Sequence, residues 1–115
     1  MNRLTPFTQL PEVKDAVISD KEGTLIEHTG TKEAESVAAV MSFFVSGLDA
    51  CGDALGFGKP LKVCCTGNNL SCVLFVHDNM IWTVYLDAGA SQSAFERKLD
   101  TFMKNTEKSG KGGLR

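Results

Sequence analysis

The chain has 115 residues, of which 43% are hydrophobic and 23% are charged, and its formal net charge is −2. This length fits one domain, and the composition excludes an intrinsically disordered or fibrous chain. A slightly acidic balance does not suit a surface that neutralises nucleic-acid phosphates, so we expect no nucleic-acid partner.

No segment of the sequence predicts insertion into a membrane. The first ten residues mix Thr5, Pro6 and Gln9 with apolar residues, and so lack the continuous apolar run of a signal peptide. Uninterrupted apolar stretches elsewhere stop far short of the ~20 residues that span a bilayer. We therefore expect a cytoplasmic protein without direct membrane insertion.

The first part of the chain predicts a short helix followed by a β-hairpin. Over residues 4–10, Thr5 suits the N-cap and Pro6 the first helical position, and Pro11 ends the segment. Residues 13–19 are β-branched and apolar, and a turn at 20–23 separates them from a second strand at 24–28.

A long helix is predicted next, over about residues 32–55. Thr31 suits its N-cap, and Glu33 and Glu35 lie in the first turns, where the helix dipole favours negative charge. Gly56 closes the helix.

The last part of the chain predicts three strands and a helix. Strands at 61–66, 70–77 and 80–88 are separated by turn residues, which indicates an antiparallel meander. The final helix starts near Ser93, which with Glu96 matches a capping box. Residues 105–115 are polar and glycine-rich, so we predict a single domain over 1–104 and a flexible polar tail over 105–115.

The long helix is apolar around more of its circumference than one sheet can cover. A first stripe, which we expect to pack on the sheet, comprises Val37, Met41, Phe44, Leu48, Cys51 and Leu55. A second stripe comprises Val40, Phe43, Gly47, Ala50 and Ala54, and a third, on the other side of the first, comprises Ala34, Ala38, Val45 and Gly52. The apolar arc spans roughly 240°, against ~100° for an ordinary surface helix.

The second stripe predicts a homodimer. Its small residues allow another backbone to come close, and Phe43 supplies an apolar knob. The strand at 61–66, if it lies at the sheet edge, offers unpaired backbone groups to a second copy. The predicted dimer interface comprises Val40, Phe43, Gly47, Ala50, Ala54, Leu61, Val63 and Cys65. The alternative is a complete monomer in which the terminal helices cover the second stripe.

Residues that could carry catalysis lack the spacing that such chemistry needs. The four cysteines match no C-x-x-C or zinc pattern, so we expect buried, reduced thiols. Near Lys59, the sequence does not match the phosphate-loop pattern. Asp53 occupies the position where that pattern requires glycine, and Pro60 occupies the position where it requires Ser or Thr. Trp82 alternates with apolar residues along its strand, a pattern typical of a core position.

Two further arrangements stay open as alternatives. His28 or His77 could join a cysteine through the fold to make a catalytic pair. Asp49 and Asp53, one helical turn apart, could form an acid/base or metal pair, although solvated neighbours are the simpler interpretation. On balance we expect no enzyme, no cofactor and no metal site.

The order of elements resembles the Roadblock/dynein light chain family. The resemblance is carried by residues 10–20, by the turn at 21–23 before Thr24-Leu25-Ile26, by the small-residue-rich central helix and by the final meander. It implies an α/β (α+β) three-layer sandwich, in which a five-stranded antiparallel sheet has the long helix on one face and the terminal helices on the other. It also implies homodimers with antiparallel central helices and joined third strands.

The same resemblance implies a function in binding. Family members regulate or scaffold small GTPases, or serve as light chains of the dynein motor. The resemblance places the GTPase near the paired helices, where this chain would present Glu35, Ser42, Ser46, Asp49 and Asp53. We therefore expect a scaffold or regulator of a Ras-like GTPase. The alternatives are an adaptor subunit of a motor or membrane-associated complex, or a profilin-like sensor with a small-ligand pocket beneath Trp82.

Overall fold

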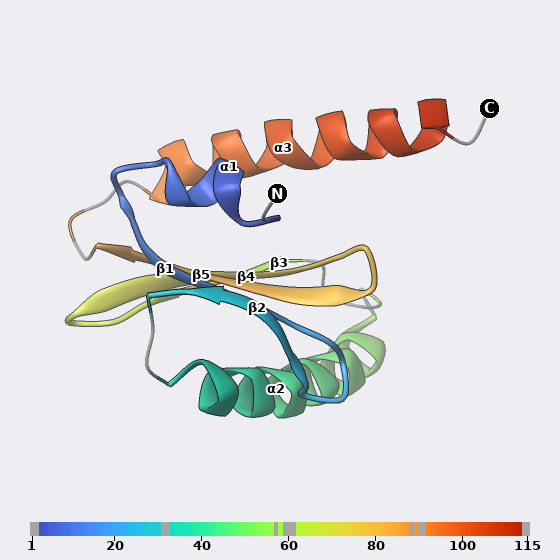
Figure 1. Cartoon of the computed structure of the whole chain (residues 1–115). Coiled ribbons are helices and arrows are strands. Elements are labelled where there is room, and N and C mark those ends of the chain that lie inside the picture. The colour runs from blue at the N-terminus through green and yellow to red at the C-terminus, as the bar shows by residue number, and fades with distance from the viewer. Residues whose placement is uncertain are drawn as a thin grey trace.

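The chain folds into three layers around one antiparallel sheet. The computed structural model describes residues 3–30, 33–56, 58, 62–87, 89 and 92–113, with side chains as far as Lys104 except Gln92. The elements are α1 (Thr5–Thr8), β1 (Val13–Ser19), β2 (Leu25–Thr29), α2 (Ala34–Leu55), β3 (Lys62–Thr66), β4 (Leu70–His77), β5 (Met80–Asp87) and α3 (Gln92–Gly113). Figure 1 shows α2 on one face of the sheet and α1 with α3 on the other, which confirms the predicted architecture.

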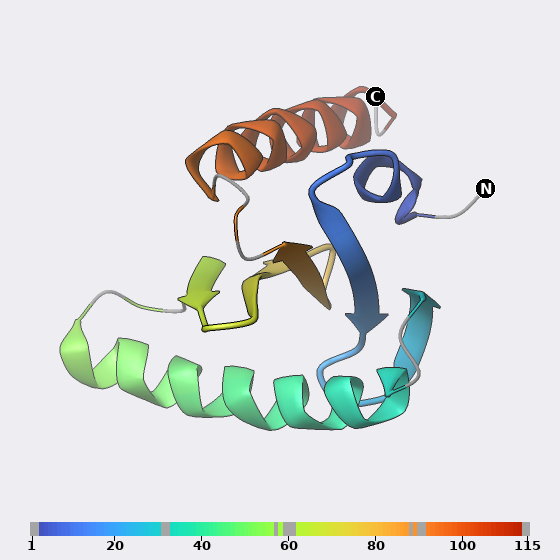
Figure 2. The same cartoon turned by 90° about the vertical axis from the view of Figure 1, so that its left-hand side faces the viewer.

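The strands are arranged in the order β2-β1-β5-β4-β3, with antiparallel pairing throughout. The chain starts the sheet with β1, adds β2 beside it at one edge, and returns after α2 to build β3, β4 and the central strand β5 from the other edge inward. Consequently β2 and β3 are the two edge strands. Figure 2 shows α2 running beneath the sheet from β2 towards β3, so one long helix underlies both edges.

The turn between β4 and β5 shows why these strands pair in this register. Asp78 and Asn79 both have left-handed backbone conformations, with φ of 56° and 60°. Two-residue hairpin turns of type I′ have positive φ at both positions, which matches the twist of the strands, and Asp and Asn tolerate that conformation well. The turn that the sequence predicted at these two residues is therefore confirmed.

The larger core lies between the sheet and the terminal helices. Phe7 from α1 is 2% exposed, and its ring centroid lies 5.9 Å from those of Phe75 and Trp82 and 4.8 Å from that of Phe102. The indole Nε1–H of Trp82 donates a hydrogen bond to the His77 carbonyl at 3.1 Å. Trp82 is therefore a core residue with its polar group satisfied, as its strand pattern predicted.

An acidic side chain holds the N-terminal helix on the sheet. The Glu27 carboxylate, from β2, accepts hydrogen bonds from the Leu4 backbone N–H and from the Arg3 guanidinium, both at 3.2 Å. The first N–H groups of a helix have no partner within the helix, so a carboxylate placed there both satisfies a donor and complements the helix dipole. Edge strand β2 is thereby coupled to α1.

The predicted helix caps differ from the structure. α1 begins at Thr5, so its N-cap is Leu4 and the predicted cap at Thr5 is wrong. α2 begins after Glu33, whose side chain makes no capping hydrogen bond, and the predicted cap Thr31 lies outside the described residues. α3 begins at Gln92, close to the predicted start near Ser93, but Ser93 is already helical and is not the predicted cap. The C-terminal end of α2 agrees with prediction, because Gly56 adopts a left-handed φ of 88° and its N–H bonds back to the Gly52 and Asp53 carbonyls.

The last helix is longer than predicted. α3 continues to Gly113, whereas the sequence predicted a flexible tail from residue 105. Lysine and glutamate are good helix formers, and no proline interrupts this stretch. Side chains beyond Lys104 lie outside the described part of the structure, and the mobility of this segment stays a prediction.

Among the described residues, α2 is the one helix long and apolar enough, by length and composition, to cross a membrane. This result differs from the expectation that no apolar stretch reaches that length, because the polar residues of α2 are too few and too scattered to lower its average hydropathy. Mostly buried core helices pass the same test, but only 17% of this stretch of α2 is buried, because α2 packs one side alone against the sheet (Figure 1).

Candidate interaction surface

The side of α2 that faces the sheet is lined by small residues. Its buried positions are Ala34, Ala38, Val45 and Gly52, the third of the predicted stripes. The prediction that the stripe from Val37 to Leu55 packs on the sheet is therefore wrong for Cys51, which is exposed, and for Phe44 and Leu55, which are 40% and 72% exposed. The other members, Val37, Met41 and Leu48, are half-buried, and Met41 packs against the small core. Small residues let the helix lie close to the strands, and this close approach turns the bulky side chains away.

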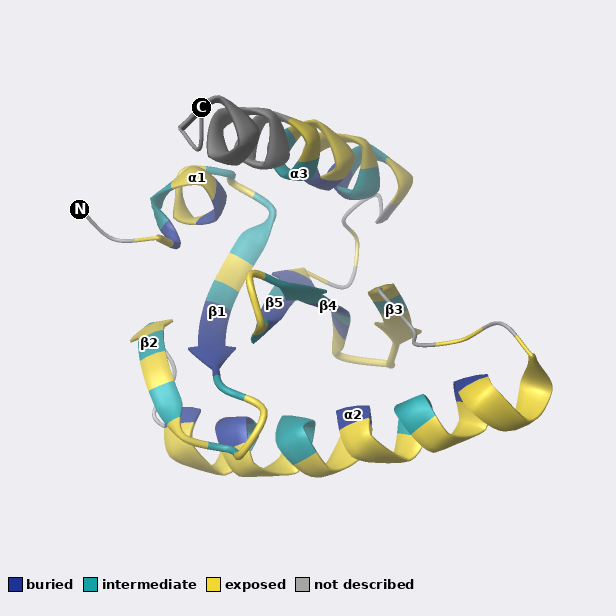
Figure 3. Ribbon diagram, turned by 90° about the vertical axis from the view of Figure 1, so that its right-hand side faces the viewer, coloured by how far each residue is buried: buried dark blue, intermediate teal, exposed yellow. Residues whose placement is uncertain are grey.

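The opposite side of α2 is apolar and uncovered. Phe43 is 72% exposed and Val40 is 60% exposed, and Gly47, Ala50 and Ala54 are exposed as well. Figure 3 shows the contrast along the whole helix, with buried positions on the sheet side and exposed positions on the outer side. All five helical residues of the predicted dimer interface thus lie together on one free surface, which we call the outer face of α2.

The terminal helices do not cover this face. Leu4, Phe7, Phe95 and Leu99, which are the buried residues of α1 and α3, pack on Phe75, Trp82 and other residues of the opposite side of the sheet. The alternative of a monomer in which the terminal helices close the second stripe is therefore wrong.

A shallow groove runs along the outer face of α2. Its lining comprises Ala39, Val40, Phe43, Phe44, Ser46, Gly47, Leu48 and Cys51. Gly47 lies between the two phenylalanines and Cys51, and a Cβ atom at this position would meet no atom within 4 Å. Phe44 and Cys51 belong to this groove, although the helical wheel had assigned them to the sheet side.

The edge strand β3 lies over the sheet side of α2. Of its predicted interface residues, Cys65 is exposed, while Val63 is half-buried against Val45, Leu74 and Ile81. Leu61 lies outside the described residues. β3 pairs only with β4 among the described strands, so its other backbone edge is open.

The predicted partner-binding residues divide into two groups. Glu35, Ser46 and Asp53 are exposed on α2, whereas Ser42 and Asp49 are half-buried. The Ser42 hydroxyl donates a hydrogen bond to the Lys21 carbonyl at 2.5 Å, and so ties the β1–β2 turn to the helix. Ser42 therefore has a structural partner within the chain, which the wheel alone could not reveal.

A glycine allows that turn to rest on the helix. Gly23 has a left-handed φ of 94°, and a Cβ atom there would lie 3.4 Å from Ala39 Cα and from Ser42 Cβ. The Asp20 carboxylate accepts hydrogen bonds from the backbone N–H groups of Glu22 and Thr24, at 3.0 and 2.8 Å, and so fixes the shape of the turn. The β1–β2 turn consequently rests on α2 at Ala39 and Ser42.

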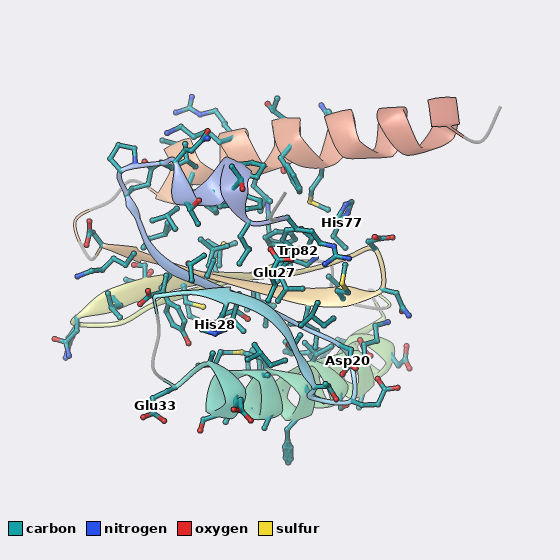
Figure 4. The ribbon with its side chains drawn as sticks, in the orientation of Figure 1. Asp20, Glu27, His28, Glu33, His77 and Trp82 are labelled. Carbon is teal, nitrogen blue, oxygen red and sulfur yellow. The ribbon has the colours of Figure 1, made fainter. Side chains whose placement is uncertain are left out.

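The two histidines lie on different sides of the sheet (Figure 4). His28 is exposed on β2, on the side of α2, and His77 packs with its ring centroid 5.8 Å from those of Trp82 and Phe102. No cluster of three or more potential metal ligands occurs among the described residues. The rings of Phe7, Phe75 and Phe102 fill the surroundings of Trp82, where a small-ligand pocket was the alternative.

The cysteines are less buried than predicted. Cys51, Cys64 and Cys65 are exposed and Cys72 is half-buried, so the expectation of buried thiols is wrong. The reason is their location, since Cys51 lines the groove along α2 and Cys64 and Cys65 lie on the edge strand β3.

A lysine connects the edge strand to the terminal helix. Lys62 Nζ lies 3.1 Å from a Glu96 carboxylate oxygen and 3.7 Å from one of Asp100. The hydrogen bond to Glu96 raises the pKa of Lys62 above its ordinary value, and Asp100 adds to the effect. This ion pair holds β3 against α3 on the side of the sheet away from α2.

Comparison with known families identifies the fold. The Roadblock/LC7 domain matches residues 3–69, which is more than half of the chain. The chain belongs to the Roadblock/LC7 family. The matched region includes α1, the β1–β2 hairpin, α2 and β3, and therefore both the outer face of α2 and the open edge of β3. A search of curated protein sequences found no match.

Solved structures share the same fold at low sequence identity. Myxococcus xanthus MglB superposes with a TM-score of 0.78 at 18% identity, covering 96% of this chain and 91% of that one. A Roadblock/LC7 domain from Streptomyces avermitilis gives 0.76 at 16% identity, with 91% of each chain covered. The gliding protein MglB from Thermus thermophilus gives 0.69 at 11% identity, covering 77% of this chain and 71% of that one.

Proposed function

We propose that this Roadblock/LC7 protein is a non-enzymatic homodimer that binds and regulates a Ras-like small GTPase in the cytoplasm. The observation that carries the proposal is the outer face of α2, where Phe43 and Val40 are 72% and 60% exposed. Contiguous apolar surface of this kind marks an interaction site in a soluble domain. A second copy of the chain is the proposed occupant.

Gly47 supports close packing of another backbone on this face. Glycine inside a helix costs about 0.5–1 kcal/mol relative to alanine, and nothing in the isolated chain touches the space where its side chain would be. The glycine therefore has no packing role within the chain. The backbone of α2 from a second copy would pack in this space.

The distribution of side-chain sizes favours antiparallel helices that cross at Gly47. In that arrangement, residues equally far from Gly47 on opposite sides face each other across the two-fold axis. Phe43 would then face Cys51 of the second copy, Phe44 would face Ala50, and Val40 would face Ala54. Each large side chain meets a small one, whereas a parallel pair would place Phe43 against Phe43.

The open edge of β3 is the second element of the predicted interface. The C-terminal part of α2 runs beneath β3 (Figure 2), whereas the outer face of α2 points away from the sheet, so pairing of the two β3 edges is proposed as an alternative to the outer-face contact. Pairing those edges would satisfy the backbone groups that an edge strand leaves open and would join the two sheets. The resemblance to the Roadblock/dynein light chain family also implies homodimers with joined third strands.

Polar residues beside the helical pair would contact the GTPase. Glu35, Ser46 and Asp53 are exposed along one side of α2, next to the outer face but outside its apolar centre. The carboxylates of Glu35 and Asp53 lie on the same side of the helix, and they suit a partner surface that carries Lys or Arg. Ser42 and Asp49 would contribute less, because both are half-buried and Ser42 already bonds to Lys21.

Affinity capture with GTPases in defined nucleotide states tests the partner. The chain is immobilised and incubated with Ras-like GTPases carrying GDP or a non-hydrolysable GTP analogue. We expect retention that depends on the nucleotide and is lost in the double variant Glu35→Lys/Asp53→Lys, which should keep the mass of the wild-type assembly. A constitutive, nucleotide-independent partner would instead support the adaptor function and contradict the regulatory one.

Disulfide trapping tests the helix arrangement. In a Phe43→Cys variant, the introduced thiol would face the native Cys51 of the second copy, and mild oxidation should give a covalent dimer. Adding Cys51→Ser should abolish that product. A covalent dimer that persists without Cys51 would contradict the antiparallel crossing at Gly47.

A further inference from the structure

Two cysteines face each other across the β3–β4 hairpin. Cys65 and Cys72 are direct cross-strand partners in the antiparallel pair. Their neighbours in register, Val63 and Leu74, both pack in the small core beneath α2, so the two thiols share that side of the sheet. Cys64 is paired with Val73 and points to the other side, towards Glu96 of α3.

The turn fixes this register. The Gly67 N–H donates a hydrogen bond to the Leu70 carbonyl at 2.9 Å, which closes a two-residue turn at Asn68 and Asn69. Hydrogen-bonded and non-hydrogen-bonded pairs alternate outward from such a turn, so Cys65 and Cys72 occupy a hydrogen-bonded position with Cα atoms about 5.5 Å apart. Disulfide-linked cysteines have Cα separations of about 4.4–6.8 Å, so the backbone spacing permits a bond.

The two thiols differ in their surroundings. Cys65 is exposed on the edge strand, whereas Cys72 is half-buried on β4. Burial raises the pKa of Cys72 to about 12, and the nearby thiols of Cys65 and Cys64 add to the increase. An oxidant therefore reaches Cys65 first, and Cys72 lies beside it as a thiol that must give up its proton when it attacks.

We propose that Cys65 and Cys72 form a redox-active pair, which a hydroperoxide converts into an intramolecular cross-strand disulfide. The Cys65 sulfur attacks an oxygen of hydrogen peroxide, the O–O bond breaks, and the products are a sulfenic acid and water. The Cys72 sulfur then attacks the Cys65 sulfur and displaces the hydroxyl group, which leaves as water with the Cys72 proton. Two thiols and one hydrogen peroxide thus give one disulfide and two waters.

The position suits a reversible bond. Cross-strand Cβ atoms lie about 4.5–5.5 Å apart, whereas a relaxed disulfide needs about 3.8 Å, so the bond forms under strain and is easily reduced. Among the described strands β3 pairs only with β4, and Lys62 connects it to α3. Oxidation would therefore act on an edge strand of the sheet.

The proposal is tested by mass spectrometry of the full chain after treatment with hydrogen peroxide. Trypsin leaves Cys64, Cys65 and Cys72 in one peptide, because no Lys or Arg separates them. We expect that peptide to lose two hydrogen atoms, to resist alkylation at two of its three thiols, and to regain both after dithiothreitol. The Cys64→Ser variant is the matched control and should behave like the wild type.

The Cys65→Ser and Cys72→Ser variants should each abolish the loss of two hydrogen atoms. Because Cys65 is exposed, Cys65→Ser should fold normally, which circular dichroism can verify, so the test stands even if the half-buried Cys72 tolerates substitution poorly. Alkylation of all three thiols after peroxide would overturn the proposal. Disulfide-linked chains in place of the internal bond, or a bond that requires Cys64, would overturn it too.

Discussion

Phe43 lies one helical turn before Gly47 on the outer face of α2, so a phenyl ring that is 72% exposed borders a position where no side chain fills the surface. A projection next to a depression on the same helix is self-complementary when a second copy is turned by two-fold rotation. Substitution at the glycine therefore separates a role in folding from a role in association.

The Gly47→Leu variant should fold as well as the wild-type chain but associate less. A leucine side chain meets no atom within the chain, and replacing a helical glycine by leucine favours the helix by several tenths of a kcal/mol. In the dimer the same side chain would hold the helices apart. Light scattering should show a lower average mass, while circular dichroism stays unchanged.

The matched control for this prediction is Asp53→Leu. Asp53 is exposed on the same helix but lies outside the apolar stripe. Its substitution by leucine should leave the mass unchanged. Equal masses for Gly47→Leu and the wild type would place the interface somewhere other than the outer face of α2.

The Phe7→Ala variant should lose about 3–5 kcal/mol of unfolding free energy, because it removes a buried aromatic ring. Phe7 is the buried residue of α1 and contacts Phe75, Trp82 and Phe102. Urea unfolding, followed by the fluorescence of the single tryptophan, measures the change. Gln9→Ala, at an exposed position, should change it by less than about 0.5 kcal/mol. A similarly small effect of Phe7→Ala would show that α1 is not part of the core.

The ion pair between Lys98 and Glu12 predicts a pH-dependent contribution to stability. Lys98 Nζ lies 2.8 Å from a Glu12 carboxylate oxygen, and this hydrogen bond lowers the pKa of Glu12. A carboxyl group with a lowered pKa stabilises the folded state above its unfolded-state pKa, and the contribution disappears as the pH falls through the lowered value. Because Lys98 is half exposed, the contribution should not exceed about 1 kcal/mol.

The Lys98→Met variant tests that contribution. NMR titration of the Glu12 carboxyl should show a higher pKa than in the wild type, and the difference in stability between the two proteins should shrink below the pH at which Glu12 becomes protonated. An unchanged Glu12 pKa would contradict the assignment.

The sequence predicted the strands and the central helix because their signals are local. The bounds of β1 and β4 agree with prediction, and Gly56 ends α2 where a left-handed residue was expected. These features depend on alternation, turn chemistry and backbone conformation over a few residues. The wide apolar surface of α2 followed from the helical spacing of its apolar residues.

The rotation of α2 on the sheet could not be predicted in the same way. A helical wheel shows which residues share a side, but Val37 and Phe44 favoured a different contact side from Ala34 and Ala38. In the structure Ala34 and Ala38 face the sheet, because small side chains let the helix lie close to the strands. The half-burial of Ser42 depends on Lys21, which reaches it only through the folded hairpin. Likewise, the exposure of the cysteines depends on which strand is at the edge.

Sedimentation equilibrium of the wild-type chain at micromolar concentration tests the central claim most directly. One chain has a mass of 12.4 kDa, and the proposed pairing of the outer faces predicts an assembly of about twice that value. A mass of 12.4 kDa across the micromolar range would contradict the homodimer and leave the outer face of α2 to a different partner.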